Sequence, residues 1–245
     1  MRVRLDLEMT RRGLAESRES AQRLIMAGRV RVNSRPAAKP DLKVDPKTEI
    51  ALIGGGPEYA SRGGYKLVAA IDHFQIEMSG RRALDVGAST GGFTDVLLQR
   101  GAASVIALDV GYGQLAEKLR RDSRVTVVDR TNIRHVAPGD LLYTPDLIVI
   151  DTSFISLRLV LPPVIEIAAP TADIVALVKP QFEVGKGKVG KGGVVRDATL
   201  RAGALDAILT FAREIGLQVV GSIESPIHGA AGNIEYLALL RKTAA

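Results

Sequence analysis

Four ionisable residues, two lysines and two acids, occur where the strands of a predicted sheet would bring them together. Asp151 ends an apolar run in LIVIDTSF, Lys179 follows another in IVALVKPQFE, and Glu235 lies near the start of a third in GNIEY. Lys66 precedes a helical pattern in SRGGYK. Any one of them could belong to an ordinary ion pair. Together they are harder to explain in that way, because neighbouring strands would bring them to one edge of the sheet, so we treat them as candidates for chemistry.

A glycine-rich loop follows the first predicted strand and would lie at the same edge. The run DVGASTGGF starts at Asp85 and contains Gly87, where the absence of a side chain lets the backbone approach a ligand closely. Asp109 ends the next strand, 22 residues after Gly87, where a carboxylate can accept hydrogen bonds from a ribose diol. The pair predicts a site for an adenosine-type nucleoside. The spacing G-x-x-x-G-G disfavours a dinucleotide site and hence a nicotinamide-dependent oxidoreductase.

This loop resembles the S-adenosylmethionine loop of Rossmann-like methyltransferases. That cofactor carries an ammonium and a sulfonium, so a nearby carboxylate suits it. The resemblance implies that the cofactor contacts the loop and the ends of the next two strands. The expected contacts are Asp85, Gly87, Ser89, Thr90, Gly91, Gly92, Phe93, Asp109, Asp129 and Asn132, with Thr131 beside them.

A second glycine-rich run, GKGKVGKGG at 185–193, nearly matches a P-loop. Gly192 stands where magnesium binding needs Ser or Thr, so we exclude nucleoside triphosphate hydrolysis. We interpret the run as a basic loop in which Lys186, Lys188 and Lys191 contact RNA phosphates. The alternative is a solvated connector.

The elements that must position these residues alternate along the chain. Strands are expected at 82–86, 104–110, 125–129, 146–151, 173–178, 217–223 and 234–240. Helices are expected before the first strand and at 93–100, 114–121, 157–168 and 198–215. This order predicts a doubly wound α/β sheet, which binds ligands at the carboxyl ends of its strands.

Positive charge is concentrated in the first quarter of the 245-residue chain. Residues 1–56 contain 12 Lys and Arg against 7 Asp and Glu, which accounts for +5 of the chain's net +6. The run GGGP at 54–57 predicts a linker, so we expect a small domain at 1–56 and a larger one at 57–245. Because residues 1–56 include no aromatic side chain, we expect RNA shape and phosphates, not stacked bases, to be recognised there.

The small domain has the pattern of a helix followed by a strand and a turn. Ser17 can cap a helix from Arg18, and Gly28 can end it. With RLD at 4–6, LI at 24–25 and VRVN at 30–33, the segment resembles the S-four RNA-binding domain, a small α+β fold that binds ribosomal or transfer RNA. We expect RNA contacts from Arg4, Arg18, Arg23, Arg29, Arg31 and Arg35.

With this domain in front, the chain resembles the FtsJ-like RNA ribose 2′-O-methyltransferases and, among them, the TlyA family, also called hemolysin A. The motifs that carry the resemblance are RGGYK, DVGASTGGFT, IDTSF, VKPQFE, GKGGVVRD and NIEY. Lys66, Asp151, Lys179 and Glu235 fall on the Lys-Asp-Lys-Glu tetrad of these enzymes. The resemblance implies a Rossmann-like fold and 2′-O-methylation of cytidine in ribosomal RNA by S-adenosylmethionine.

The implied reaction requires that a ribose hydroxyl lose its proton as it attacks the methyl group. A lysine can be the base only if its pKa lies well below the usual ~10.4; a second ammonium lowers that pKa and carboxylates raise it. We expect Lys179 to be the base or to stabilise the alkoxide, with Lys66 and Glu235 positioning it and the ribose. Asp151 and Glu235 would also orient the lysine and balance the sulfonium.

Two other functions stay open at this point: a non-catalytic factor that binds ribosomes or RNA, and a membrane-acting hemolysin. The sequence contains neither the apolar core of a signal peptide at its start nor the roughly 18 apolar residues of a membrane span. It contains no cysteine, so disulfides and thiolate metal sites are excluded. We expect a cytoplasmic protein that acts on ribosomal RNA or ribosomal subunits without a metal; the oligomeric state is not indicated.

Overall fold

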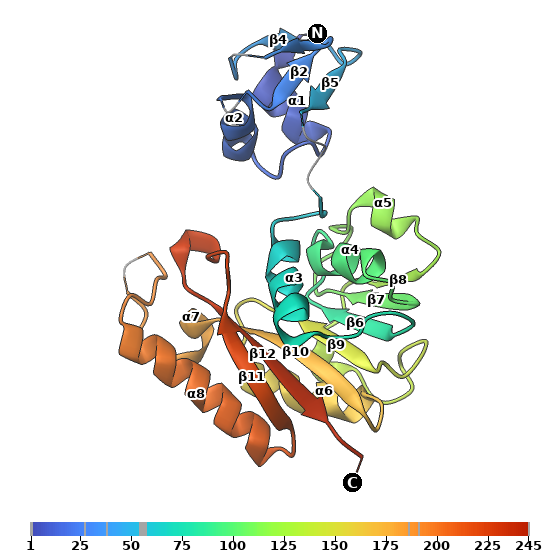
Figure 1. Cartoon of the computed structure of the whole chain (residues 1–245), viewed down its shortest axis with the longest axis vertical. Helices are drawn as coiled ribbons and strands as arrows, with labels where there is room; N and C mark the ends of the chain where they lie inside the picture. Colours follow the sequence, from blue (N-terminus) through green and yellow to red (C-terminus); the bar gives the residue numbers. More distant parts are fainter. Residues whose placement is uncertain are drawn as a thin grey trace. The chain divides into compact units, whose positions relative to one another are not determined.

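The structure is a computed structural model that describes residues 2–26, 28–37, 39–53, 58–185, 187–190 and 192–244. The predicted linker at 54–57 and two predicted RNA contacts, Lys186 and Lys191, lie outside the described residues. The chain divides into two units, Met1–Ser61 and Arg62–Ala245. Each is described by itself (Figure 1).

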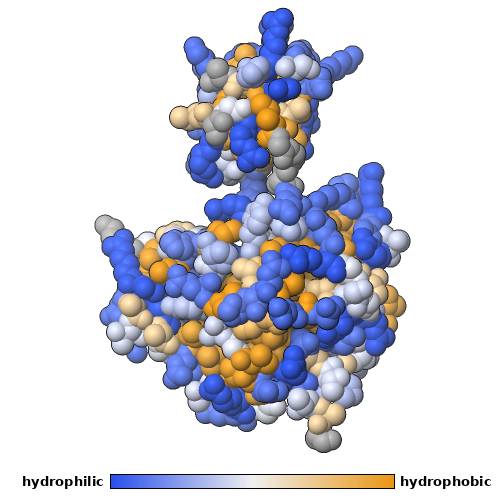
Figure 2. Space-filling model, in the orientation of Figure 1, coloured by the Kyte–Doolittle hydropathy of each residue, from blue (hydrophilic) through white to orange (hydrophobic). Residues whose placement is uncertain are grey.

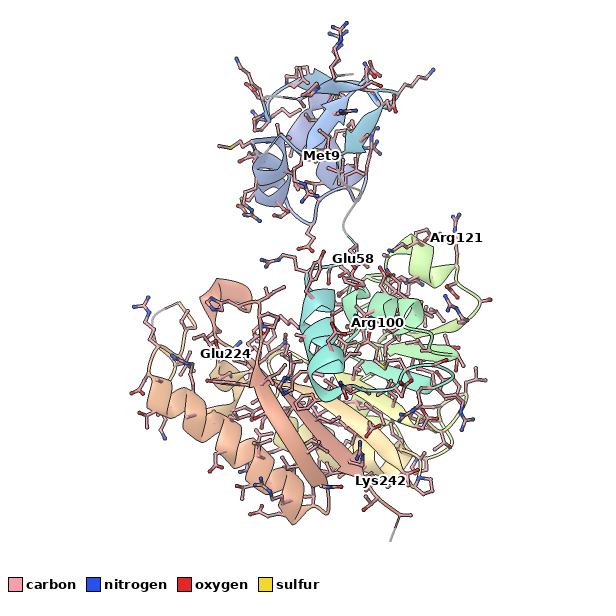
Figure 3. The ribbon with its side chains drawn as sticks, in the orientation of Figure 1. Met9, Glu58, Arg100, Arg121, Glu224 and Lys242 are labelled. Carbon is pink, nitrogen blue, oxygen red and sulfur yellow. The ribbon has the colours of Figure 1, made fainter. Side chains whose placement is uncertain are left out.

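The first unit combines two helices with short strands around a small apolar core. Met9 lies inside this unit (Figure 3), fully buried together with Leu5 and Val30. Its elements are β1 (Val3–Arg4), α1 (Leu5–Arg11), α2 (Arg18–Met26), β2 (Val30–Val32), β3 (Arg35–Pro36), β4 (Lys43–Val44) and β5 (Ile50–Leu52). Strand β2 pairs with β3 and β5, and β1 pairs with β4.

The predicted helix of this unit and its boundaries are confirmed. Ser17 Oγ accepts a hydrogen bond from the Ser20 amide at 3.2 Å, and Gly28 after the helix has a φ of 69°. Asn33 and Ser34 form the turn after β2, both with positive φ. Helix α1 was not predicted, because its buried Asp6 and Glu8 interrupt the apolar pattern.

The second unit is built on a seven-stranded sheet in the order β11-β12-β10-β9-β6-β7-β8. The strands are β6 (Arg82–Val86), β7 (Ser104–Leu108), β8 (Val125–Val128), β9 (Leu147–Ile150), β10 (Ala172–Val178), β11 (Gln218–Glu224) and β12 (Tyr236–Lys242). Five neighbouring strands from β10 to β8 run parallel, while β12 is antiparallel to both β10 and β11. The predicted strands and the α/β fold are confirmed; the reversed direction of β12 was not predicted.

Helices cover both faces of this sheet (Figure 1). They are α3 (Gly63–Phe74), α4 (Gly92–Gln99), α5 (Glu117–Arg120), α6 (Leu157–Ile167), α7 (Pro180–Glu183) and α8 (Ala198–Glu214), with 3-10 turns at Ile133–His135 and Ala230–Gly232. Leu84 and Ile148 share a buried cluster with residues of α6 and α8. Asp85 points to the other face, where Thr94 of α4 contacts it. Burial on both faces explains uninterrupted apolar runs such as LIVI.

The helix predicted at 114–121 is much shorter than expected. Only Glu117–Arg120 is helical, because the preceding residues form a loop against the glycine-rich segment. Gly113 has a φ of 66°, and the Ala116 amide donates to the Thr90 carbonyl at 3.2 Å. Residues of this loop are thus available at the carboxyl edge of the sheet.

Candidate active site

The first of two lysine–carboxylate pairs joins α3 to the residue before β12. Lys66 Nζ lies 2.6 Å from Glu235 Oε2, and the two residues are only 9% and 2% exposed. Gly229 leaves room for the carboxylate, since a Cβ at that position would collide with Glu235 Oε1. The pair is therefore buried and held by elements that are 169 residues apart.

The second pair joins the ends of two parallel strands. Lys179 follows β10 and Asp151 follows β9, and these strands pair in register, Ala176 opposite Ile150. Lys179 Nζ lies 2.6 Å from Asp151 Oδ1 and donates to Ser153 Oγ at 3.0 Å. Lys179 is buried, whereas the Asp151 side chain is 24% exposed. The ammonium is thus oriented by two acceptors on one loop.

Gln181 contacts the first pair from the helix that follows Lys179. It lies two residues after Lys179, and its Nε2 donates to Glu235 Oε1 at 3.3 Å. Its Oε1 is buried and, among the described residues, has no hydrogen-bond partner. Val178 of β10 pairs with Tyr236 of β12, so Lys179 and Glu235 lie one residue beyond this pair at the same edge of the sheet. The structure therefore brings the two lysine–carboxylate pairs to one end of the sheet. Sequence analysis missed Ser153 and Gln181, although both lie inside the motifs DTSF and KPQFE.

An exposed aromatic ring lies beside this set. Phe154 is 91% exposed and has a φ of 63°, which is costly for a residue with a bulky side chain. Its ring centroid lies 5.2 Å from that of Phe182, and Lys179 Nζ lies 5.9 Å from the Phe182 centroid. An exposed ring held this way can stack on a nucleobase. Its exposure depends on backbone conformation, and sequence analysis did not identify it.

A cavity of about 700 Å³ opens at the carboxyl ends of β6, β7 and β9. Its volume lies within the range of small-molecule sites. The catalytic candidate Asp151 lines it. So do four predicted cofactor residues and the neighbouring Thr131; the four are Gly87, Ser89, Asp109 and Asn132. Further lining residues that sequence analysis missed include Val110, Gln114, Thr152 and Ile155. The cavity thus combines backbone, carboxylate and apolar surfaces, as a nucleoside requires.

Asp109 is held in place by the two loops that flank it. Ser89 N donates to Asp109 Oδ2 at 2.8 Å, and Gly111 N donates to Asp109 Oδ1 at 2.7 Å. A carboxylate has about four acceptor positions, so both oxygens can still accept hydrogen bonds from a ligand. Asp109 is consequently a fixed acceptor facing the cavity.

Gly87 is required by the close approach of two loops. Its φ is 87°, and a Cβ there would lie 2.6 Å from the Asp151 backbone oxygen. At Gly91, also with positive φ, a Cβ would meet the side-chain ends of Leu119 and Leu115 instead. The glycine loop therefore lies directly against the backbone of Asp151, and through it near Lys179.

Asp85 lies beneath the loop as a fully buried carboxylate. Thr94 Oγ1 donates to its Oδ2 at 2.6 Å, while Oδ1 has no hydrogen-bond partner within the described ranges. Burial raises the pKa of Asp85 to about 7; the hydrogen bond from Thr94 opposes this rise, and the charges of Asp151 and Asp109 add to it. Asp109 and Asp151 therefore bring carboxylates to the cavity, whereas Asp85 lies buried and is not among the lining residues.

The remaining predicted cofactor residues are not among those that line the cavity. Gly91, Gly92 and Phe93 are buried at the start of α4, and Thr90 is exposed next to them. Asp129 accepts from the Gly113 amide at 3.0 Å and forms an ion pair with Arg120 at 3.4 Å. These residues shape the loops around the cavity in this structure, and their contact with a cofactor stays a prediction.

The predicted RNA-binding arginines of the first unit fall into two groups. Arg4 and Arg18 bind the buried Asp6, at 2.9 and 3.0 Å, and with Gln22 they hold the pKa of this carboxyl far below its usual value. The other four are exposed and form no ion pair with any described residue; they are Arg23, Arg29, Arg31 and Arg35. Hydrophilic side chains project from this unit in Figure 2. Lys188, in the second unit, is also exposed.

Within the ranges described, no helix combines the length and apolar character that crossing a membrane would need.

Comparison with known families matches both parts of the chain. Residues 59–242 match the model of the FtsJ-like methyltransferases, and residues 3–50 match that of the S4 domain. The first match covers most of the chain, including all four ionisable candidates and the cavity.

The similarity to individual proteins extends over nearly the whole sequence. The chain is 53% identical to the 16S/23S rRNA (cytidine-2′-O)-methyltransferase TlyA of Mycobacterium tuberculosis (strain CDC 1551 / Oshkosh), across 98% of this chain and 90% of that protein. It is 41% identical to Hemolysin A of Brachyspira hyodysenteriae, across 96% and 98%. The fold is also similar to a solved structure of a putative hemolysin from Streptococcus thermophilus, with a TM-score of 0.79 and 44% sequence identity. The match covers 99% of this chain and 89% of that one.

Proposed function

This chain belongs to the FtsJ-like methyltransferase family, and from that premise we propose that it methylates the ribose 2′-oxygen of a cytidine in ribosomal RNA, with S-adenosylmethionine as methyl donor. The observation that carries the proposal is the position of Asp151. Its side chain lines the cavity and also binds Lys179, so the cavity and the candidate base share one residue. The cytidine and ribosomal specificity follow the name of the Mycobacterium tuberculosis relative.

The residues around the cavity fit this methyl donor. Asp109 would accept the ribose hydroxyls, and Val110 and Ile133 offer apolar surface to the base. The carboxylates of Asp109 and Asp151 line the cavity and would supply the negative charge that a cationic donor requires. When bound, S-adenosylmethionine supplies a methyl group on a sulfonium, which is open to attack by an oxygen.

The tetrad prepares the attacking oxygen. Lys179 is held by Asp151 and Ser153, so its Nζ has a fixed direction. As the ammonium it would stabilise the developing alkoxide, and it would act as the base only from its neutral form, after releasing its own proton to solvent. Lys66 and Glu235 would position that ribose through their buried pair. Because an in-line displacement needs its atoms aligned, rigid placement of these groups supplies a large part of the rate.

The first unit would bind the RNA outside the reaction centre. Its exposed arginines suit phosphate groups, to which guanidinium forks bind in a bidentate manner. Lys188 would add a contact from the glycine-rich segment of the second unit. Because ribosomal RNA is the proposed substrate, we also propose that the protein acts in the cytoplasm.

The test is methyl transfer from labelled S-adenosylmethionine to ribosomal subunits that lack 2′-O-methylated cytidine. The purified chain should add 2′-O-methylcytidine, and Lys179→Ala should abolish the product while cofactor binding persists. Lys242→Ala is the matched control: its Nζ donates to Ile165 and Ala168 carbonyls, away from the tetrad, so the product should still form. RNA that is bound but not methylated would contradict the proposal and identify a non-catalytic RNA-binding factor.

A further inference from the structure

Glu183, the last residue of α7, makes two contacts that the proposed reaction does not use. Its Oε2 accepts a hydrogen bond from Ser156 Oγ, and its Oε1 accepts from the Leu157 amide at 2.9 Å. Ser156 Oγ in turn accepts from the Arg158 amide at 3.2 Å, as the N-cap of α6. A carboxylate from α7 thus helps to satisfy the free amides at the start of α6.

This carboxylate lies in surroundings that disfavour its charge. Burial raises the pKa of Glu183, against the hydrogen bonds from Ser156 and Leu157 and the charge of Arg158, which lower it. Burying an acid is costly unless its hydrogen bonds are worth the desolvation. The two hydrogen bonds to the start of α6 offset this cost and hold the carboxylate in place.

Lys179 and Glu183 bind opposite ends of the segment 151–156. Residues 151–156 line the cavity, and Lys179 binds this loop at Asp151 and Ser153. Glu183, four residues after Lys179, binds the same loop where it enters α6. Between the two, the Phe154 and Phe182 rings are in contact. Helix α7 and the cavity wall are consequently joined at both ends.

We propose that Glu183 is a positioning residue for methyl transfer, which holds the cavity wall at 151–156 against α7 and so fixes Lys179 relative to the bound methyl donor. This inference rests on the proposed function. Its physical basis is alignment: a displacement of about 1 Å in a reacting group can lower a rate by about 10²-fold.

The test compares Glu183→Ala and Glu183→Gln with a matched control. Glutamine can still accept from the Leu157 amide and can donate to Ser156 Oγ, so it should restore most of the alignment. Asp197→Ala is the control, because Asp197 Oδ1 also caps a helix, accepting from the Thr199 and Leu200 amides at 2.7 and 3.2 Å. The chain is assayed whole, with ribosomal subunits and S-adenosylmethionine, and its folding is followed by thermal unfolding.

Glu183→Ala should lower kcat by about 10- to 100-fold, with the KM for RNA changed less than about threefold. Glu183→Gln should recover most of kcat, and Asp197→Ala should lower the thermal midpoint without lowering kcat. If Glu183→Ala does not fold, Ser156→Ala takes its place, since it removes one Glu183 contact and should lower kcat to a smaller extent.

The inference is overturned if Glu183→Ala, or Ser156→Ala in its place, retains full kcat, or if Asp197→Ala loses as much kcat as Glu183→Ala does. A wild-type chain that forms no product would overturn the proposed function as well. An active wild type with an equally active Glu183→Ala would overturn the inference alone.

Discussion

Lys179 reaches from the end of β10 to Asp151 at the end of β9, where its Nζ lies 2.6 Å from Oδ1. The two residues are neighbours because their strands are parallel, paired, and end at the same edge of the sheet. Asp151 also lines the cavity, and its backbone oxygen packs against Gly87. A single strand end therefore connects the glycine loop, the cavity and the buried amine.

The Lys66–Glu235 pair should contribute to folding as well as to activity. Glu235→Gln leaves the Lys66 ammonium buried without its carboxylate, and breaking a buried pair costs about 3–5 kcal/mol. We expect a loss of that order in the free energy of unfolding, measured by urea denaturation. The double variant Lys66→Met/Glu235→Gln should regain part of this stability but no methyl transfer.

The matched control for this prediction is the exposed pair of Arg121 and Glu117, whose side chains are 78% and 64% exposed. Because surface pairs contribute little, Glu117→Gln should change the free energy of unfolding by less than about 1 kcal/mol. Equal losses for Glu235→Gln and Glu117→Gln would show that burial of the first pair has no consequence for folding.

Much of the sheet and of the tetrad's placement could be predicted from sequence, because both depend on local patterns. Apolar runs predict strands, and the residue after a parallel strand lies at the carboxyl edge; Asp151 and Lys179 follow from these two rules. The reversed direction of β12 could not be predicted in this way, since an apolar run has the same pattern in either direction. The roles of the four ionisable residues stay predictions.

Other features depend on contacts that a single sequence does not reveal. Gln181 and Glu183 lie in a four-residue helix, too short to show a helical period, and their partners are 54 and about 27 residues away. Asp6 in α1 is buried because two arginines and Gln22 bind it. A polar residue at a buried position breaks the apolar pattern by which a helix is recognised in a sequence. Such residues become visible only when the fold brings their partners together.

The glycine loop should tolerate alanine far less at Gly87 than at Gly91. At Gly87 the added Cβ would meet the Asp151 backbone oxygen at 2.6 Å, which cannot move without shifting β9. At Gly91 it would meet only side-chain ends of leucines, which can rotate. Both changes carry the cost of positive φ, about 1–3 kcal/mol. Calorimetry with S-adenosylmethionine should show binding lost in Gly87→Ala and weakened in Gly91→Ala; the reverse order would contradict the close approach.

Asp85 should make stability depend on pH in an unusual direction. Burial raises its pKa from 3.8 to about 7, so between these values the folded state holds a proton that the unfolded chain has released. Stability must then fall as pH rises through this window, by up to about 1.4 kcal/mol per pH unit. Asp85→Asn removes this titration. Its free energy of unfolding, measured by urea denaturation, should therefore increase relative to that of the wild type as the pH rises from 4 to 7. If the free energy of unfolding depends on pH in the same way in both proteins, the pKa of Asp85 is not raised by burial.

The exposed and the paired arginines of the first unit should differ in their effect on RNA binding. Arg31 is exposed and forms no ion pair with any residue in the described ranges, whereas Arg18 binds the buried Asp6. If Arg31 contacts a phosphate, Arg31→Ala should reduce the slope of log affinity against log salt concentration by about 0.7–0.9 and leave thermal unfolding unchanged. Arg18→Ala should instead destabilise the first unit, because Asp6 loses one of the donors that keep its charge buried. Fluorescence anisotropy with a ribosomal RNA fragment at several salt concentrations measures the slopes. Equal slopes for wild type and Arg31→Ala would remove Arg31 from the RNA-binding surface.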